Sequence, residues 1–135
     1  MKVVLDTNVL VSGLMTQGGH CDRILRLAFH EVLQLCVDER IMAEYEVVLP
    51  RPRLRLDPED IVETLEVIRS SAEFVTAPPL AVALPDPTDR PFLEVASEAE
   101  AVLVTGNTRH FPARARSGVT VVKPRGFLDL LNRPS

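Results

Sequence analysis

The chain has 135 residues, of which 46% are hydrophobic and 25% are charged, and its net charge is −4. This composition is that of an ordinary globular domain and excludes disordered, collagenous and fibrous proteins. No apolar run reaches the ~18–20 residues that a membrane helix needs, and Asp6 interrupts the first apolar stretch too early for a signal peptide. The two cysteines, Cys21 and Cys36, form no C-x-x-C pattern, so we expect neither a disulfide framework nor a zinc site. Such cysteine usage is typical of a reducing compartment, and we therefore expect a cytoplasmic location.

Positive charge is concentrated near the C-terminus of an otherwise acidic chain. Residues 101–135 hold six Lys or Arg and a single acid, whereas residues 1–100 hold nine Lys or Arg and 18 acids. An acidic chain is a poor non-specific ligand of nucleic acid, but a basic segment can still guide a phosphate-bearing substrate to an acidic site.

Strand-like and helix-like segments alternate through the first half of the chain. Runs of Val and Leu predict strands, apolar residues at helical spacing predict helices, and Asn8 and Asp38 are the expected N-caps of two of these helices. In chain order we expect a strand at 2–5, helices at 9–15 and 20–30, a strand at 32–37 and a helix from 38 to about 49.

The second half begins with a strong helix start at Asp57, which is followed by proline and two acids. From there we expect a helix over 57–69, an extended piece at 73–76, a loop over 78–87, a helix through 92–99 that Asp89 opens, strands at 101–105 and 119–122, and a helix at 126–131. Apolar strands separated by helices predict an α/β fold with a mainly parallel sheet covered on both faces.

Ligands of parallel sheets bind outside the carboxyl ends of the strands. The first strand ends in Asp6-Thr7-Asn8, and the strand 101–105 ends in Thr105-Gly106-Asn107. Asp6 is therefore a candidate site residue, although a turn or cap residue would occupy the same position.

Glu44 interrupts an apolar helix face. It lies within the stripe formed by Ile41, Tyr45 and Val48 in the helix over 38–49. A carboxylate that faces a core costs several kcal/mol unless it is paired or binds a metal. The alternatives are a position at the edge of the stripe or a salt bridge to an arginine.

Asp89 opens its helix between Pro87 and Pro91, with Asp86 as a second candidate in the same loop. An acid at this position is often a helix cap or a partner of the helix dipole. If Asp6, Glu44 and Asp89 gather in one place, each pair at ~5 Å repels by roughly 3 kcal/mol. Such a cluster needs a cation or a retained proton, and its oxygen ligands favour Mg²⁺ or Mn²⁺ over zinc.

Four segments together resemble the PIN domain, in the branch of toxin components of toxin–antitoxin pairs. These are VLDTNVLVSGL at 4–14, AEYEVVL at 43–49, DPTDRPFLEVA at 86–96 and VTGNTRHFP at 104–112. The resemblance covers essentially the whole chain and implies a single domain over 1–135, with an α/β/α sandwich around a mainly parallel sheet.

The same resemblance implies a Mg²⁺- or Mn²⁺-dependent ribonuclease whose catalytic metal ligands are Asp6, Glu44 and Asp89. Asn107 occupies the position of a fourth family acid and adds no charge, which weakens a second metal site more than the first. Thr7, Asn8 and Thr105 match polar positions that orient the acids and bound water. The expected partners are single-stranded or structured RNA, a small antitoxin protein and a second copy of the chain in a homodimer, with no membrane.

Arginines near the acids are the expected substrate ligands. Arg51 and Arg53 follow the helix that carries Glu44, and Arg109 and His110 follow the strand 101–105. Solvated loop charge is the alternative for either pair.

Three other functions are compatible with parts of the sequence. A haloacid dehalogenase would need a second Asp at the position of Asn8, and a receiver domain would need paired acids after its first strand, so both fit poorly. The stronger alternative is a PIN-like module that binds RNA or protein with little or no cleavage, and Asn107 is the residue that favours it.

Overall fold

A five-stranded parallel sheet forms the centre of the fold in the computed structural model, which describes residues 1–133. Its spatial order is β3-β2-β1-β4-β5. The strands are β1 (Lys2–Leu5), β2 (Gln34–Val37), β3 (Glu73–Phe74), β4 (Val102–Val104) and β5 (Val121–Val122). The central strands are almost uniformly apolar because helices cover both of their faces.

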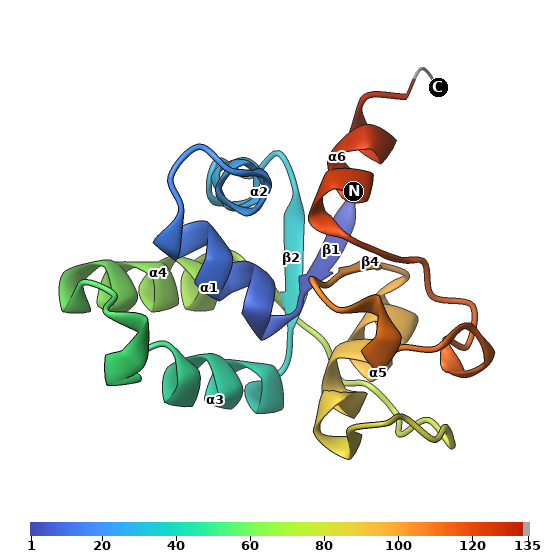
Figure 1. The fold of residues 1–135 in the computed structure, drawn as a ribbon. Helices are drawn as coiled ribbons and strands as arrows, with labels where there is room; N and C mark the ends of the chain where they lie inside the picture. Colours follow the sequence, from blue (N-terminus) through green and yellow to red (C-terminus); the bar gives the residue numbers. More distant parts are fainter. Residues whose placement is uncertain (134–135) are drawn as a thin grey trace.

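Helices form a layer on each face of the sheet (Figure 1). They are α1 (Thr7–Met15), α2 (His20–Phe29), α3 (Glu39–Val48), α4 (Pro58–Ser71), α5 (Arg90–Ala99) and α6 (Pro124–Leu131). The chain adds β2 and β3 on one side of β1 and then returns to β4 on the other, so right-handed crossovers place α5 on the face opposite α2 and α4. The predicted three-layer α/β/α architecture is confirmed. Within residues 1–133, no helix combines the length and the apolar character that crossing a membrane requires.

The helix α3 lies where it can reach the carboxyl ends of the strands. It contacts β2, α4 and α5. Ile41 and Tyr45 are buried, and the Tyr45 hydroxyl donates a hydrogen bond to the carbonyl oxygen of Leu5, the last residue of β1. This contact fixes the register of α3 against the end of β1.

Most predicted elements are present, with shifted ends. The prediction that Asn8 caps the first helix is wrong, because α1 begins at Thr7 and the Asp6 carboxylate accepts the hydrogen bond of the Thr7 N–H. Asp38 is the N-cap of α3 as predicted, since its Oδ1 accepts from the Ile41 N–H at 2.9 Å. The final helix begins two residues earlier than predicted because Pro124 fits the first helical turn.

The long connection between β3 and α5 is tied down by a buried acid on α5. Glu94 is only 3% exposed; its Oε1 accepts from Arg40 Nη1 on α3 at 2.7 Å, and its Oε2 accepts from the Leu80 N–H at 2.9 Å. Arg90 Nη2 donates to the Val82 carbonyl at 2.7 Å. These bonds hold the segment that leads into Asp89.

We predict that Glu94→Ala lowers the free energy of unfolding by about 2–4 kcal/mol, because it leaves the Leu80 N–H without its acceptor and removes one of the two carboxylates that Arg40 bonds. Glu94→Gln retains an acceptor for Leu80 and should cost less. Urea unfolding measures both, and Glu98→Ala, an exposed acid of the same helix, is the control with an expected change below about 0.5 kcal/mol. An equal loss in Glu94→Ala and Glu98→Ala would contradict this role of Glu94.

Candidate functional site

The pairing of β1 with β4 places Asp6 beside Thr105. Leu5 pairs with Val104, and the Asp6 N–H donates to the Val104 carbonyl at 2.9 Å. The Asp6 side chain accepts three hydrogen bonds, from the Thr7 N–H to Oδ1 at 2.8 Å and to Oδ2 from the Thr105 hydroxyl at 2.7 Å and from Asn8 Nδ2 at 3.5 Å. Asp6 is thereby buried and held at the carboxyl edge of the sheet.

Polar side chains join the two loops that follow β1 and β4. The Asn8 Oδ1 accepts from the Gly106 N–H at 3.0 Å. The Thr105 hydroxyl, which donates to Asp6, accepts from the Asn107 N–H at 3.0 Å. The predicted orienting residues Asn8 and Thr105 therefore both bond to the loop after β4, at Gly106 and Asn107.

Glu44 faces the same region from α3. It is half-buried at the edge of the stripe formed by Ile41 and Tyr45, and the Thr7 hydroxyl donates a hydrogen bond to its Oε2. Thr7 therefore bonds Asp6 through its backbone N–H and Glu44 through its side chain. This places Glu44 beside the end of β1 and outside the core.

Asp89 reaches the region from the start of α5. It ends the short turn Pro87–Asp89, is 7% exposed and makes no capping hydrogen bond to α5. Its Oδ2 lies 2.9 Å from Nδ1 of His110, in the loop after β4. Asp89 thus occupies the N-cap position of α5 without a side-chain capping bond, and its carboxylate bonds His110, a predicted substrate ligand.

The three acids share a raised pKa with the same main cause. Burial raises the pKa of Asp89 to about 6, and the nearby charge of Asp6 adds to the effect. Burial also raises the pKa of Asp6, where the hydrogen bonds from Thr105 and Thr7 oppose it. The pKa of Glu44 is raised by burial and then by the charges of Asp6 and Asp86. The folded chain thus brings together three carboxyl groups whose ionisation is costly.

Asp86 behaves in the opposite way. Hydrogen bonds from the Thr88 hydroxyl and N–H to its Oδ1 lower the pKa of Asp86 below its usual value. The ionised Asp86 side chain thus caps the turn Pro87–Asp89.

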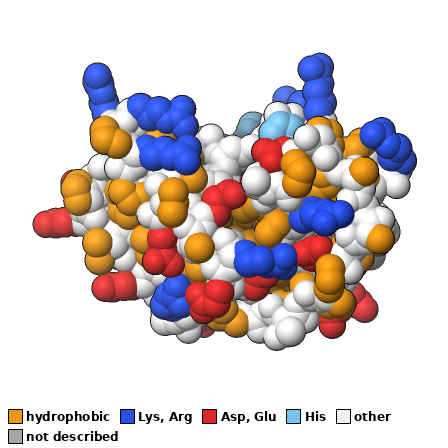
Figure 2. All heavy atoms as spheres, turned by 90° about the horizontal axis from the view of Figure 1, so that it is seen from below, with side chains coloured by type: hydrophobic (Ala, Val, Ile, Leu, Met, Phe, Trp, Pro, Cys, Tyr) orange, Lys and Arg blue, Asp and Glu red, His pale blue; other side chains and the backbone are white. Residues whose placement is uncertain are grey.

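An open pocket of about 550 Å³ adjoins the acids. The side chains that line it are Ala43, Glu44, Val47, Val48, Arg51, Asp86, Thr88 and Asp89. Figure 2 looks onto this edge of the sheet and shows Asp and Glu side chains across the face, with Lys and Arg at the upper left and upper right and also among the acids near the centre. Acidic and basic side chains thus share this edge of the sheet.

The donor set suits a hard divalent cation, because all three candidate ligands are carboxylates that burial makes costly to ionise. In the structure, however, these carboxylates do not form a complete metal site. Among residues 1–133, no three acidic, histidine or cysteine side chains lie close enough to hold one ion together.

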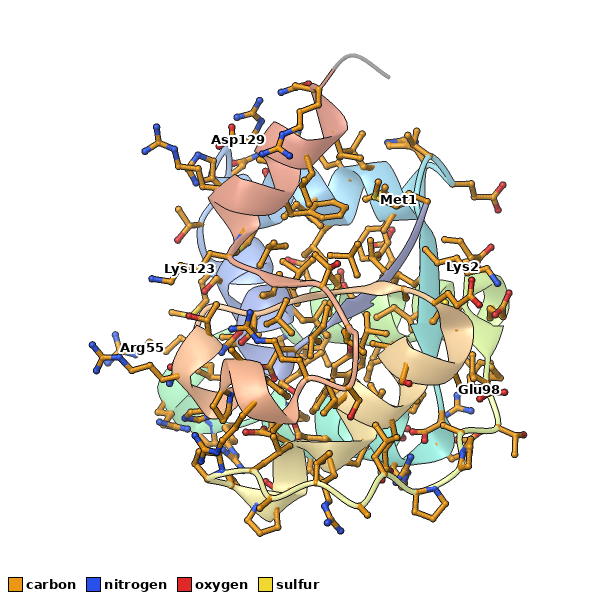
Figure 3. All side chains as sticks on the ribbon, turned by 90° about the vertical axis from the view of Figure 1, so that its right-hand side faces the viewer. Met1, Lys2, Arg55, Glu98, Lys123 and Asp129 are labelled. Atoms are coloured by element: carbon orange, nitrogen blue, oxygen red, sulfur yellow. The ribbon has the colours of Figure 1, made fainter. Side chains whose placement is uncertain are left out.

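The predicted arginines occupy different distances from the acids. Arg51 lines the pocket, and its charge acts on Glu44. Arg53 and Arg109 are exposed in short turns, and neither forms an ion pair within the described part of the chain. Figure 3 shows that Arg55, which follows Arg51 and Arg53 in the predicted basic segment, projects from the same side of the molecule as Lys123.

Two contacts at the candidate site could not be predicted from the sequence. The bond between His110 and Asp89 joins residues 21 positions apart without a motif that spans them, and the bond from Tyr45 to Leu5 follows only from how α3 packs. The apolar stripe that contains Tyr45 indicated its burial, but not its hydrogen bond.

We predict that Asp89→Asn raises the melting temperature in EDTA at pH 8 by about 3–5 °C, because the substitution removes a charge that burial disfavours. The pKa of Asp89 is raised from 3.8 to about 6, because the folded state favours the protonated carboxyl. The stability that this protonated form contributes is complete below about pH 4 and is lost as the pH rises through 6. The gain should therefore shrink between pH 8 and pH 5, as thermal unfolding in a pH series will show.

Asp86→Asn is the matched control for this measurement. Its pKa is lowered, so the carboxylate stabilises the fold at neutral pH and this contribution is lost as the pH falls. The substitution should lower the melting temperature at pH 8. A rise in both variants, or in neither, would show that the two acids do not differ in the way described.

The chain has relatives in both sequence and fold. A family model described as PIN domain matches residues 2–109. The uncharacterized protein MJ1680 of Methanocaldococcus jannaschii is 30% identical over 110 residues, which cover 79% of this chain and 71% of that protein. A chain of the crystal structure of VapBC2 from Rickettsia felis, bound to a DNA fragment from their promoter, shares the fold with a TM-score of 0.60 and 18% identity, covering 91% of this chain and 98% of that one. The sequence match over most of the chain shows that it belongs to the PIN domain family.

Proposed function

We propose that this chain is a ribonuclease that depends on Mg²⁺ or Mn²⁺ and serves as the toxin of a type II toxin–antitoxin pair. The observation that carries the proposal is the meeting of Asp6, Glu44 and Asp89 at the carboxyl edge of the sheet, where burial raises the pKa of each. Membership in the PIN domain family and the fold shared with VapBC2 support a nuclease of a toxin–antitoxin system.

A divalent cation bound by the acids supplies charge neutralisation of a phosphodiester and a more acidic bound water. The chain's own residues prepare that chemistry. Thr105 and the Thr7 N–H hold the two oxygens of Asp6, and the Thr7 hydroxyl orients Glu44. These bonds fix the acids before substrate arrives, which reduces the reorganisation needed during the reaction.

Basic side chains beside the acids are the proposed contacts to the RNA backbone. Arg51 lines the pocket with Glu44 and Asp89, and Arg53 is exposed in the next turn. Arg109 is exposed in the loop after β4. Contacts of this type bind phosphates without reading sequence, so they give affinity and a strong dependence on salt.

Two protein partners belong to the proposal. By its resemblance to toxins of toxin–antitoxin pairs, the chain would bind a small antitoxin over the acidic pocket. Homodimerisation is proposed through the outer face of α4, where Val62 is 55% exposed. Light scattering of the purified chain, alone and with the antitoxin, measures both interactions.

The second candidate function is a PIN-like module that binds RNA or protein with little or no cleavage. Asn107 favours it, because an amide stands where a fourth acid would add charge. Among residues 1–133, no three acidic, histidine or cysteine side chains are placed to hold one ion together, which also favours binding without cleavage. The first experiment below separates the two functions.

We predict cleavage of single-stranded RNA in Mg²⁺ or Mn²⁺, its loss in EDTA, and a loss of at least about 100-fold in Asp6→Asn, because the neutral amide keeps an acceptor for the Thr7 N–H but removes the charge that holds the cation. Asp129→Asn, an exposed acid of α6, is the control with unchanged cleavage. RNA binding without cleavage by the wild type in every metal would establish the second function, and full activity of a folded Asp6→Asn would remove Asp6 from the site.

We predict that Arg51→Ala raises KM for RNA about 10-fold and weakens the dependence of binding on salt, because one phosphate contact is lost. Fluorescence anisotropy with labelled RNA at several salt concentrations measures the slope. Arg23→Ala, an exposed arginine of α2, should leave both quantities unchanged. Equal effects of the two substitutions would indicate that total charge, and not the position of Arg51, determines binding.

A further inference from the structure

His110 connects the loop after β4 to an acid on another element. Its Nδ1 lies 2.9 Å from Asp89 Oδ2, and 40% of its side chain is exposed, against 10% for Asp89. When Asp89 is ionised, the Nδ1–H donates this hydrogen bond, because a carboxylate can only accept.

The backbone on which His110 sits is held at several points. The His110 N–H donates to the Asn107 carbonyl at 3.2 Å, and the Phe111 N–H donates to the Thr108 carbonyl at 3.0 Å. The Phe111 side chain is fully buried and anchors the turn in the core.

The same loop is bonded to the residue that orients Asp6. The Asn107 N–H donates to the Thr105 hydroxyl at 3.0 Å, and that hydroxyl donates to Asp6 Oδ2 at 2.7 Å. One loop therefore orients two acids, Asp6 through Thr105 and Asp89 through His110. It performs both tasks without a carboxylate of its own, because Asn107 stands at the fourth family position.

We propose that His110 is a positioning residue, which holds Asp89 Oδ2 through Nδ1 and so presents the other carboxylate oxygen, Oδ1, to the divalent cation. The inference rests on the proposed function, because it assumes that Asp89 is a metal ligand. Groups that hold a ligand carboxylate in place commonly contribute 10–100-fold to metal affinity. It also revises the role predicted for His110 from the sequence, from binding RNA to orienting an acid.

Two amide substitutions test the position of the donor. His110→Asn places an amide nitrogen near the position of Nδ1, whereas His110→Gln places it near the position of Nε2, away from Asp89. His110→Ala removes the donor altogether. The control is His30→Ala, an exposed histidine after the last turn of α2.

The main measurement is the Kd for Mn²⁺ of the purified chain without RNA, by isothermal titration calorimetry. We expect His110→Ala and His110→Gln to weaken Mn²⁺ binding about 10-fold, and His110→Asn and His30→Ala to stay within about 3-fold of the wild type. Cleavage assays should show the same order in the metal concentration for half-maximal rate, with kcat at saturating Mn²⁺ and KM for RNA near the wild-type values. Circular dichroism and thermal unfolding verify that each variant folds.

Other outcomes would contradict the proposed role of His110, its Nδ1 contact or the metal site itself. Unchanged Mn²⁺ binding in His110→Ala, with a raised KM for RNA, would make His110 a substrate ligand. A lower kcat at saturating Mn²⁺ in all three His110 variants would make it a catalytic residue. Equal losses in His110→Asn and His110→Gln would remove the Nδ1 contact as the cause. If the wild type binds no Mn²⁺, the proposed function fails with the inference, whereas wild-type binding that is lost in Asp6→Asn and kept in His110→Ala overturns the inference alone.

Discussion

The parallel pairing of β1 with β4 is the constraint on which the candidate site depends. The two strands are adjacent in space although about 100 residues separate them in the chain, and their pairing puts Asp6 beside Thr105. Because strands in a parallel sheet all end at one edge, side chains that follow them are gathered without any further device. The helix α3 and the turn before α5 then bring Glu44 and Asp89 to that edge.

The site is assembled at a cost in stability. Burial raises the pKa of Asp6, Glu44 and Asp89, so the folded chain holds negative charge that water would solvate better. The remainder of the structure offsets this cost through an apolar core and through bonds such as those that Glu94 makes to Arg40 and Leu80. Concentrated destabilising charge of this kind is typical of functional sites.

Fold and site give different kinds of information about this chain. The fold shared with VapBC2 at 18% identity describes a scaffold, and a scaffold by itself does not define a reaction. The individual features lie in the loop after β4, where Asn107 adds no charge and His110 bonds Asp89. We propose that the loop supplies orientation in place of a further acidic ligand.

The sequence alone determined the order and type of the elements, because apolar runs, helical spacing and prolines act locally. It also marked Asp6 through its place at a strand end and Glu44 through its place on an apolar face. Only the tertiary structure decided that Asp6 caps α1, that Glu44 bonds Thr7 and that His110 bonds Asp89. These contacts join residues that strand pairing and helix packing bring together, and no local pattern encodes such distances.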